Sequence, residues 1–131
     1  MRILITTGRA ASLLNVSKDV AHVAAKLGHV PRIAVFIDSP ASAGAMCDAA
    51  LLIYPASPLF CSHYFLFYRD FKRGVGKPIA FYTMVEGRPT ARHIQPWMRR
   101  ELEFIACSNY VREKLEEVGL QVTDVIHHGL V

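Results

Sequence analysis

The sequence predicts an α/β fold: a doubly wound, Rossmann-like sheet of six mostly parallel strands with helices on both faces. Short apolar runs typical of strands alternate with helical patterns about six times in 131 residues, which favours a parallel sheet with right-handed crossovers. Hydrophobic residues make up 52% of the chain and charged residues 20%, a composition typical of a globular domain and not of a disordered chain. No apolar stretch approaches the roughly 20 residues that a membrane span requires. We therefore expect residues 1–131 to form a single domain.

The first half of the chain contains three strand patterns and two helical patterns. Strands are expected at residues 2–7, 31–38 and 49–54, and helices at residues 16–27 and, more weakly, 41–47. The run from 31 to 38 is apolar nearly throughout, as a strand covered on both faces should be. Asn15 or Ser17 is expected to cap the first helix, and Gly28 suits its left-handed end. The buried side of this helix is expected to contain Val16, Val20, Val23, Ala24 and Leu27, and its polar side Ser17, Lys18, Asp19 and Lys26.

The second half of the chain repeats the alternation. Strands are expected at residues 78–83, 103–107 and 123–127, and helices at residues 59–73, 94–101 and 110–118. Pro96 suits a first helical turn, Ser108 or Asn109 is expected to cap the last helix, and Gly119 to end it. The sequence stops within four residues of the last strand, where an α/β domain would usually add a helix, so we expect a domain boundary there.

Cysteine and charge usage restrict the function classes. Cys47, Cys61 and Cys107 are an odd number without CxxC spacing, which is typical of reduced thiols in a cytoplasmic protein. The six histidines form no metal-binding pattern, so no metal site is expected. A net charge of +4 is a small basic excess without a recognition motif, so nucleic acid is not an expected partner. The few amide side chains favour a thermophilic source; they are Asn15, Asn109, Gln95 and Gln121.

Four stretches of the chain carry recognisable motifs. They are Leu-Gly-His-Val at residues 27–30, the loop at 82–89, the strand and Arg-x-x-Leu helix at 104–115, and the strand and His-Gly turn at 125–131. In this order and spacing they resemble the amino-terminal domain of group 1 (family 4) glycosyltransferases of the GT-B architecture. The resemblance extends over the whole chain.

This resemblance implies half of an enzyme that moves a sugar from a nucleotide-sugar to a hydroxyl acceptor with retention, without a metal. The amino-terminal domain would hold a sugar or lipid-linked acceptor. A carboxy-terminal domain or separate chain would hold the donor and the family's pair of glutamates, which are absent here. No other cofactor is implied, and this chain alone is expected to show negligible transfer activity.

The turn after the first strand is a candidate substrate-binding element. Gly8 and Arg9 follow the strand, and in a doubly wound sheet this loop borders the ligand crevice. Backbone N–H groups and Arg9 would meet phosphate or carboxylate oxygens. The dinucleotide fingerprint is missing, and the alternative is a plain turn with a surface arginine.

Glu86 is the expected catalytic residue. It follows the fourth strand, in a loop fixed by Gly87 and Pro89. A carboxylate there would orient an acceptor hydroxyl or accept its proton. The alternatives are a solvated loop acid or a carboxylate paired with Arg88.

Two segments combine aromatic and basic residues. In the segment 60–73, Phe60, Tyr64, Phe67 and Phe71 share one helical face, and Arg69, Lys72 and Arg73 follow. This pattern is typical of a membrane- or acceptor-contacting helix; a buried crossover helix with a basic end is the alternative. The second segment suits a sugar or phosphate acceptor, with Arg88 and His93 as expected contacts; it contains Arg88, Arg92, His93, Trp97, Arg99 and Arg100.

Two other readings of the whole chain remain open. One is a non-catalytic, membrane-docking or anion-binding subunit, peripheral on the inner face of the membrane, that recruits a separate catalytic chain. The other is a small flavodoxin-like domain that binds FMN or a nucleotide. Independently of these readings, the exposed last strand indicates that isolated molecules can pair as homodimers through surfaces that a second domain would cover.

Overall fold

The computed structural model describes residues 1–35, 39–56, 62–85 and 94–127. It contains β1 (Arg2–Thr7), α1 (Ala11–Lys26), β2 (Val30–Val35), α2 (Pro40–Met46), β3 (Ala49–Ile53), α3 (Ser62–Asp70), the π-helical turn η1 (Phe71–Val75), β4 (Ile79–Thr83), α4 (Pro96–Glu101), β5 (Glu103–Ala106), α5 (Asn109–Glu117) and β6 (Gln121–Val125). Each expected strand and helix is present. β1 has the expected bounds and the other elements have shifted ends, while the expected ends at residues 38 and 59 lie outside the described residues.

The six strands form one sheet in the order β2-β1-β3-β4-β5-β6, and every pair is parallel. The predicted doubly wound α/β fold is therefore confirmed. The first five strands follow the flavodoxin-like order and not the 3-2-1-4-5-6 order of dinucleotide-binding domains. The winding direction reverses at β1, which lies between β2 and β3.

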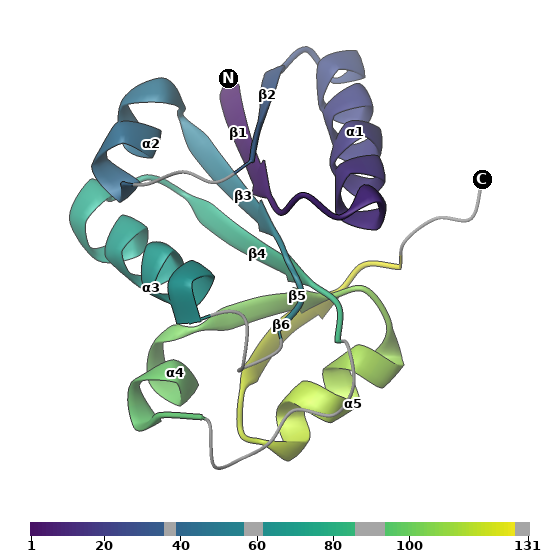
Figure 1. Cartoon of the computed structure of the whole chain (residues 1–131), viewed down its shortest axis with the longest axis vertical. Coiled ribbons are helices and arrows are strands. Elements are labelled where there is room, and N and C mark those ends of the chain that lie inside the picture. The colour runs from purple at the N-terminus through teal and green to yellow at the C-terminus, as the bar shows by residue number, and fades with distance from the viewer. Residues whose placement is uncertain (36–38, 57–61, 86–93, 128–131) are drawn as a thin grey trace.

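Helices cover the two faces of the sheet unequally. Side chains of α2, α3, α4 and α5 join one large core with Leu4, Leu52, Phe81 and Phe104 of the strands, and Figure 1 shows α2 and α3 across the strands from α1. The centre of this core is aromatic: Phe81 and Phe104 lie 4.9 Å apart between ring centroids, and Phe65 of α3 lies 5.9 Å from each.

The other face carries a smaller core beneath α1. Leu13 and Val16 of the helix pack against Ile5, Ile53 and Tyr82 of the strands. In the part of the chain that the structure describes, α1 is the helix that contributes to this core.

The buried side of α1 differs from the expected one. Val23 and Leu27 are 55% and 71% exposed, so their assignment to the buried side was wrong. Ser17 is fully buried instead, because its hydroxyl donates to the Leu13 carbonyl at 2.8 Å, a bond within the helix that satisfies a buried serine. The buried residues of α1 are Leu13, Val16, Ser17 and Ala24, so the buried side includes Val16 but not Val23 or Leu27.

The start of α1 differs from the expected one, whereas its end agrees with the prediction. The helix begins at Ala11, so neither Asn15 nor Ser17 caps it, and its N-cap Ala10 offers no side-chain bond. Its other end agrees with the prediction, because Gly28 adopts a φ of 88°.

Strand β2 is half-buried and not covered on both faces as expected. It is an outer strand of the sheet, with β1 on one side only. This place also explains Pro31, since proline cannot donate to a strand ladder and is tolerated at the edge of a sheet.

A glycine sets the contact between α2 and η1. A Cβ at Gly44 would lie 2.6 Å from Val75 Cγ1, so the two elements pack closer than any other residue permits. Lys77 fixes the same junction, because its ammonium donates to the Gly44 and Cys47 carbonyls at 2.6 and 2.9 Å.

We expect Gly44→Ala to lower the free energy of unfolding by about 1–3 kcal/mol, as overpacking does, although alanine is the better helix former. Urea unfolding measures the change. Gly74→Ala is the matched control, since a Cβ there meets nothing within 4 Å. Equal stability of the two variants would contradict the close contact.

Candidate functional site

The candidate site lies where β1 and β3 end side by side. Their parallel register brings Thr7 next to Ile53, and the chain winds in opposite directions from these two strands. Ligands of doubly wound sheets bind at such a switch point, outside the carboxyl ends of the strands. Gly8 and Arg9 follow β1, and Tyr54 follows β3. We call this side of the sheet the carboxyl edge, and the side where strands begin the amino edge.

Two threonines lock the strand ends of this edge together. The buried Thr7 hydroxyl donates to the Ile53 carbonyl at 2.8 Å, and the buried Thr83 hydroxyl donates to the Tyr54 carbonyl at 2.8 Å. These side-chain bonds join β1 to β3 and β4 to β3. They make a rigid floor, and the hydroxyls already have acceptors within the protein.

Tyr54 forms a wall of the site that the sequence analysis missed. Its ring stacks on Tyr64 of α3 with centroids 3.8 Å apart and planes at 18°. A Cβ at Gly8 would lie 2.7 Å from Tyr54 Cε2 and 3.1 Å from Leu13 Cδ1. Gly8 is therefore required for packing against this ring. The only sequence signal was an aromatic residue directly after a strand that ends at the switch point.

The amino end of α1 gives the site a positive potential. The N-cap Ala10 supplies no side-chain acceptor, and the first turn holds no acidic residue. The first backbone N–H groups of a helix lack partners within it and carry its positive dipole end. Arg9, an exposed side chain, adjoins them. Together they form a setting suited to an anionic or strongly polar group.

Three predicted site residues lie outside the described residues: Glu86, Arg88 and His93. The chain enters this segment from β4, which ends at Thr83 beside β3. Phe60 of the aromatic segment also lies outside the described residues. Their roles stay predictions.

The described part of the aromatic segment, residues 63–73, contributes to the core. Tyr64 and Phe67 are only 5% and 7% exposed, so these two side chains do not form a surface for a membrane or an acceptor. The reason is topological: α3 connects β3 to β4, and its aromatic side packs onto the sheet in the large core. The alternative interpretation, a buried crossover helix with a basic end, describes it correctly.

The basic end of that segment lies far from the switch point. Lys72 reaches Glu103, the first residue of β5, at 3.7 Å, which places it at the amino edge. Arg73 pairs with Glu101, and Arg69 with Asp70 at 2.9 Å. The three cations line a groove of about 230 Å³ with Arg100 and Glu101. The structure thus places them at the edge opposite Gly8 and Arg9, so the two predicted groups do not form one site.

Burial affects the pKa of two groups near the carboxyl edge, Tyr82 and Cys107. Burial raises the pKa of Tyr82, with a smaller contribution from nearby Cys107, and burial also raises the pKa of the Cys107 thiol. The Tyr82 hydroxyl donates to the Ile126 carbonyl at 2.8 Å, across β5. Both groups are neutral at neutral pH, so neither is an activated nucleophile.

Neither a metal-binding cluster nor a membrane-spanning helix is found among the described residues. No group of three or more His, Cys, Asp or Glu side chains is placed to hold a metal ion. In the same part of the chain, no helix combines the length and apolar character needed to cross a membrane.

Comparison with known proteins finds no family model that matches the chain. The chain is 27% identical over 130 residues to a protein of Sulfolobus islandicus rod-shaped virus 1 named uncharacterized glycosyltransferase 335. That match takes in 99% of this chain but 36% of the viral protein. Among solved structures, a cysteine-to-alanine mutant of flavodoxin from Pseudomonas aeruginosa is similar at a TM-score of 0.48 and 14% identity, over 97% of this chain and 83% of that one.

We expect Gly8→Ala to destabilise the fold by about 1–3 kcal/mol, because the new methyl group meets the Tyr54 ring. The same change in a Tyr54→Ala background should cost less, since the ring is gone. A double-mutant cycle by urea unfolding measures this coupling. Strict additivity of the two changes would contradict the proposed contact.

We expect Tyr82→Phe to lower the unfolding free energy by about 1 kcal/mol at neutral pH, because one hydrogen bond is lost. The folded pKa of Tyr82 lies above its ordinary value of 10.0, so its contribution is present below that pH and is lost as the pH rises through the folded pKa. Wild-type stability should therefore fall more steeply at alkaline pH than that of the variant. Parallel alkaline slopes in urea unfolding would refute this.

Proposed function

We propose that this chain is the acceptor-binding domain of a glycosyltransferase of the GT-B architecture. The observation that carries the proposal is the similarity to the viral glycosyltransferase, which extends along 99% of the chain. The motifs at residues 27–30, 82–89, 104–115 and 125–131 support the same family. The reaction would transfer a sugar from a nucleotide-sugar to an acceptor hydroxyl with retention of configuration.

The switch point would hold the acceptor. The amino end of α1 and the Arg9 guanidinium would bind an anionic or polar acceptor group, and Tyr54 would bound the crevice. The Tyr54 ring already occupies the space against Gly8. In dinucleotide-binding domains, a glycine in this turn lets a pyrophosphate approach the backbone. The occupied space favours an acceptor over a nucleotide in this domain.

The chemistry would be shared between two domains. Glu86 would orient the acceptor hydroxyl or accept its proton, with Arg88 and His93 holding the acceptor. A second domain or separate chain would bind the nucleotide-sugar and stabilise the leaving diphosphate, where most of the rate acceleration of such a transfer arises. The chain spans about a third of its viral relative, so the matched segment is one part of that protein.

A second candidate function is an anion-binding or membrane-docking subunit that recruits a separate catalytic chain. The groove favours it, because four cations and one carboxylate line it: Arg69, Lys72, Arg73, Arg100 and Glu101. Burial of Tyr64 and Phe67 removes the aromatic part of that argument. Binding to anionic vesicles that is lost when Arg69, Lys72 and Arg73 are neutralised together would favour this function.

We expect Glu86→Gln to lower kcat about 100-fold or more in the protein that carries a donor-binding domain, because general-base assistance contributes about that factor. Release of nucleoside diphosphate from a nucleotide-sugar in the presence of acceptor measures the rate. Glu113→Gln, an exposed acid on α5, is the control and should leave the rate unchanged.

Two results would count against these assignments. Unchanged turnover in Glu86→Gln would remove Glu86 as a catalytic residue. Failure of the assembled protein to use any nucleotide-sugar, together with tight FMN binding by residues 1–131, would replace the proposed function with the flavodoxin-like alternative.

A further inference from the structure

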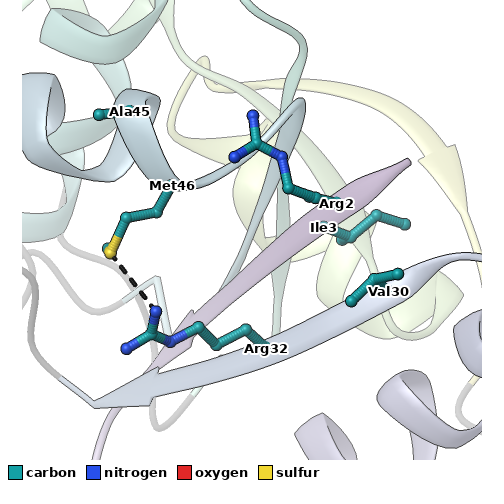
Figure 2. A pocket seen from close by; sticks show the side chains of 6 residues that line it. All are labelled: Arg2, Ile3, Val30, Arg32, Ala45 and Met46. Carbon is teal, nitrogen blue, oxygen red and sulfur yellow. Dashed lines mark hydrogen bonds between the residues drawn. The ribbon is translucent and has the colours of Figure 1, made fainter.

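A cavity of about 410 Å³ lies at the amino edge, between the outer strand β2, its neighbour β1 and the end of α2. Figure 2 shows its lining, in which two arginine side chains flank the Met46 side chain. Parallel register places Arg2 opposite Val30 and Leu4 opposite Arg32. Arg2 and Arg32 therefore lie on the same face of the sheet, two positions apart on neighbouring strands. The lining residues are Arg2, Ile3, Val30, Arg32, Ala45 and Met46.

The walls of the cavity are mostly apolar. Val30 is 65% exposed, and Met46 projects from the last turn of α2 toward Arg32 (Figure 2). Ligand sites commonly combine apolar walls with a small number of placed polar groups, in cavities of roughly this size. The apolar walls suit a ligand body that is aliphatic or aromatic.

The two arginines of the cavity have different hydrogen-bond partners. Asp48 accepts from the Arg2 backbone N–H at 2.7 Å and from the Arg2 guanidinium at 3.3 Å. The backbone bond, assisted by the guanidinium, holds the pKa of Asp48 below its usual range, so this carboxylate neutralises Arg2. The Arg32 guanidinium donates to the Met46 thioether at 3.7 Å. Sulfur is a weak acceptor, and within the described residues no ion pair to Arg32 is formed.

We propose that this cavity binds an amphiphilic monoanion, a carboxylate, sulfonate or phosphodiester attached to an apolar body. The Arg32 guanidinium would exchange the weak thioether contact for two charge-assisted hydrogen bonds to the anionic group. Val30, Ala45 and Met46 would cover the apolar body. Two guanidinium groups and one carboxylate leave one net positive charge, which matches a monoanion better than a dianion.

This site is independent of the proposed acceptor site. Arg2 and Val30 begin their strands, whereas Gly8 and Tyr54 follow strand ends. The cavity therefore lies at the opposite edge of the sheet from the switch point. A ligand bound here would leave the switch point open.

The test uses residues 1–131 and the fluorescent probe anilinonaphthalene sulfonate, an aromatic monoanion. We expect one bound probe per chain, with amide chemical-shift changes centred on Val30, Arg32, Ala45 and Met46. Arg32→Gln should weaken binding about tenfold or more, since one charged hydrogen-bonding partner is lost. Arg112→Gln removes an exposed arginine of α5 and is the matched control for net charge; it should not change the affinity.

A neutral probe separates charge from apolar contact. Phenylnaphthylamine has the same ring system without the sulfonate, and its affinity should be equal for the wild type and Arg32→Gln. Equal affinity of the sulfonate probe for the two proteins would overturn the proposal. So would shift changes centred instead on Tyr82 and Ile105, which belong to the core on the α1 face of the sheet.

Discussion

The structure depends on one constraint: parallel strands are joined by right-handed crossovers, and the winding direction reverses at β1. The step from β1 to β2 runs one way across the sheet, and the four later steps run the other way. Right-handed crossovers therefore put α1 on one face of the sheet and α2 to α5 on the other. Accordingly, the side chains of α1 join one core and those of α2 to α5 join the other. The same reversal separates the loops that follow β1 and β3 and so creates the candidate site.

Local patterns in the sequence were sufficient for the strands and most helices, because strand runs, Ser108 as a cap and Gly28 as a left-handed terminus depend on near neighbours. Which side of a helix is buried depends on partners that are distant in sequence. The apolar stripe of α1 contains more residues than its contact with the sheet covers, so Val23 and Leu27 were placed on the wrong side. The aromatic face of α3 fits a core and an interface equally well, and only its packing against Phe81 and Phe104 decides between them.

The position of the candidate site could be predicted from the sequence, but its contact between Gly8 and Tyr54 could not. Gly8 and Arg9 were identified because loops at the carboxyl edge border ligands in this class of fold. Tyr54 was missed because its importance comes from a contact with Gly8, 46 residues away in sequence, that no local pattern reveals. The basic residues after α3 lie at the amino edge, so an acceptor held at the switch point would not meet them. The two edges of the sheet thus carry separate groups of predicted binding residues.

The most direct test of the account is to sequence the native gene beyond the codon for Val131 and to assay the encoded protein for sugar transfer. The account predicts that a donor-binding α/β domain with two glutamates seven residues apart is encoded there or on a chain that co-purifies, and that the assembled protein consumes a nucleotide-sugar. A stop codon directly after Val131, with no donor-binding chain co-purifying from the native source, would contradict it.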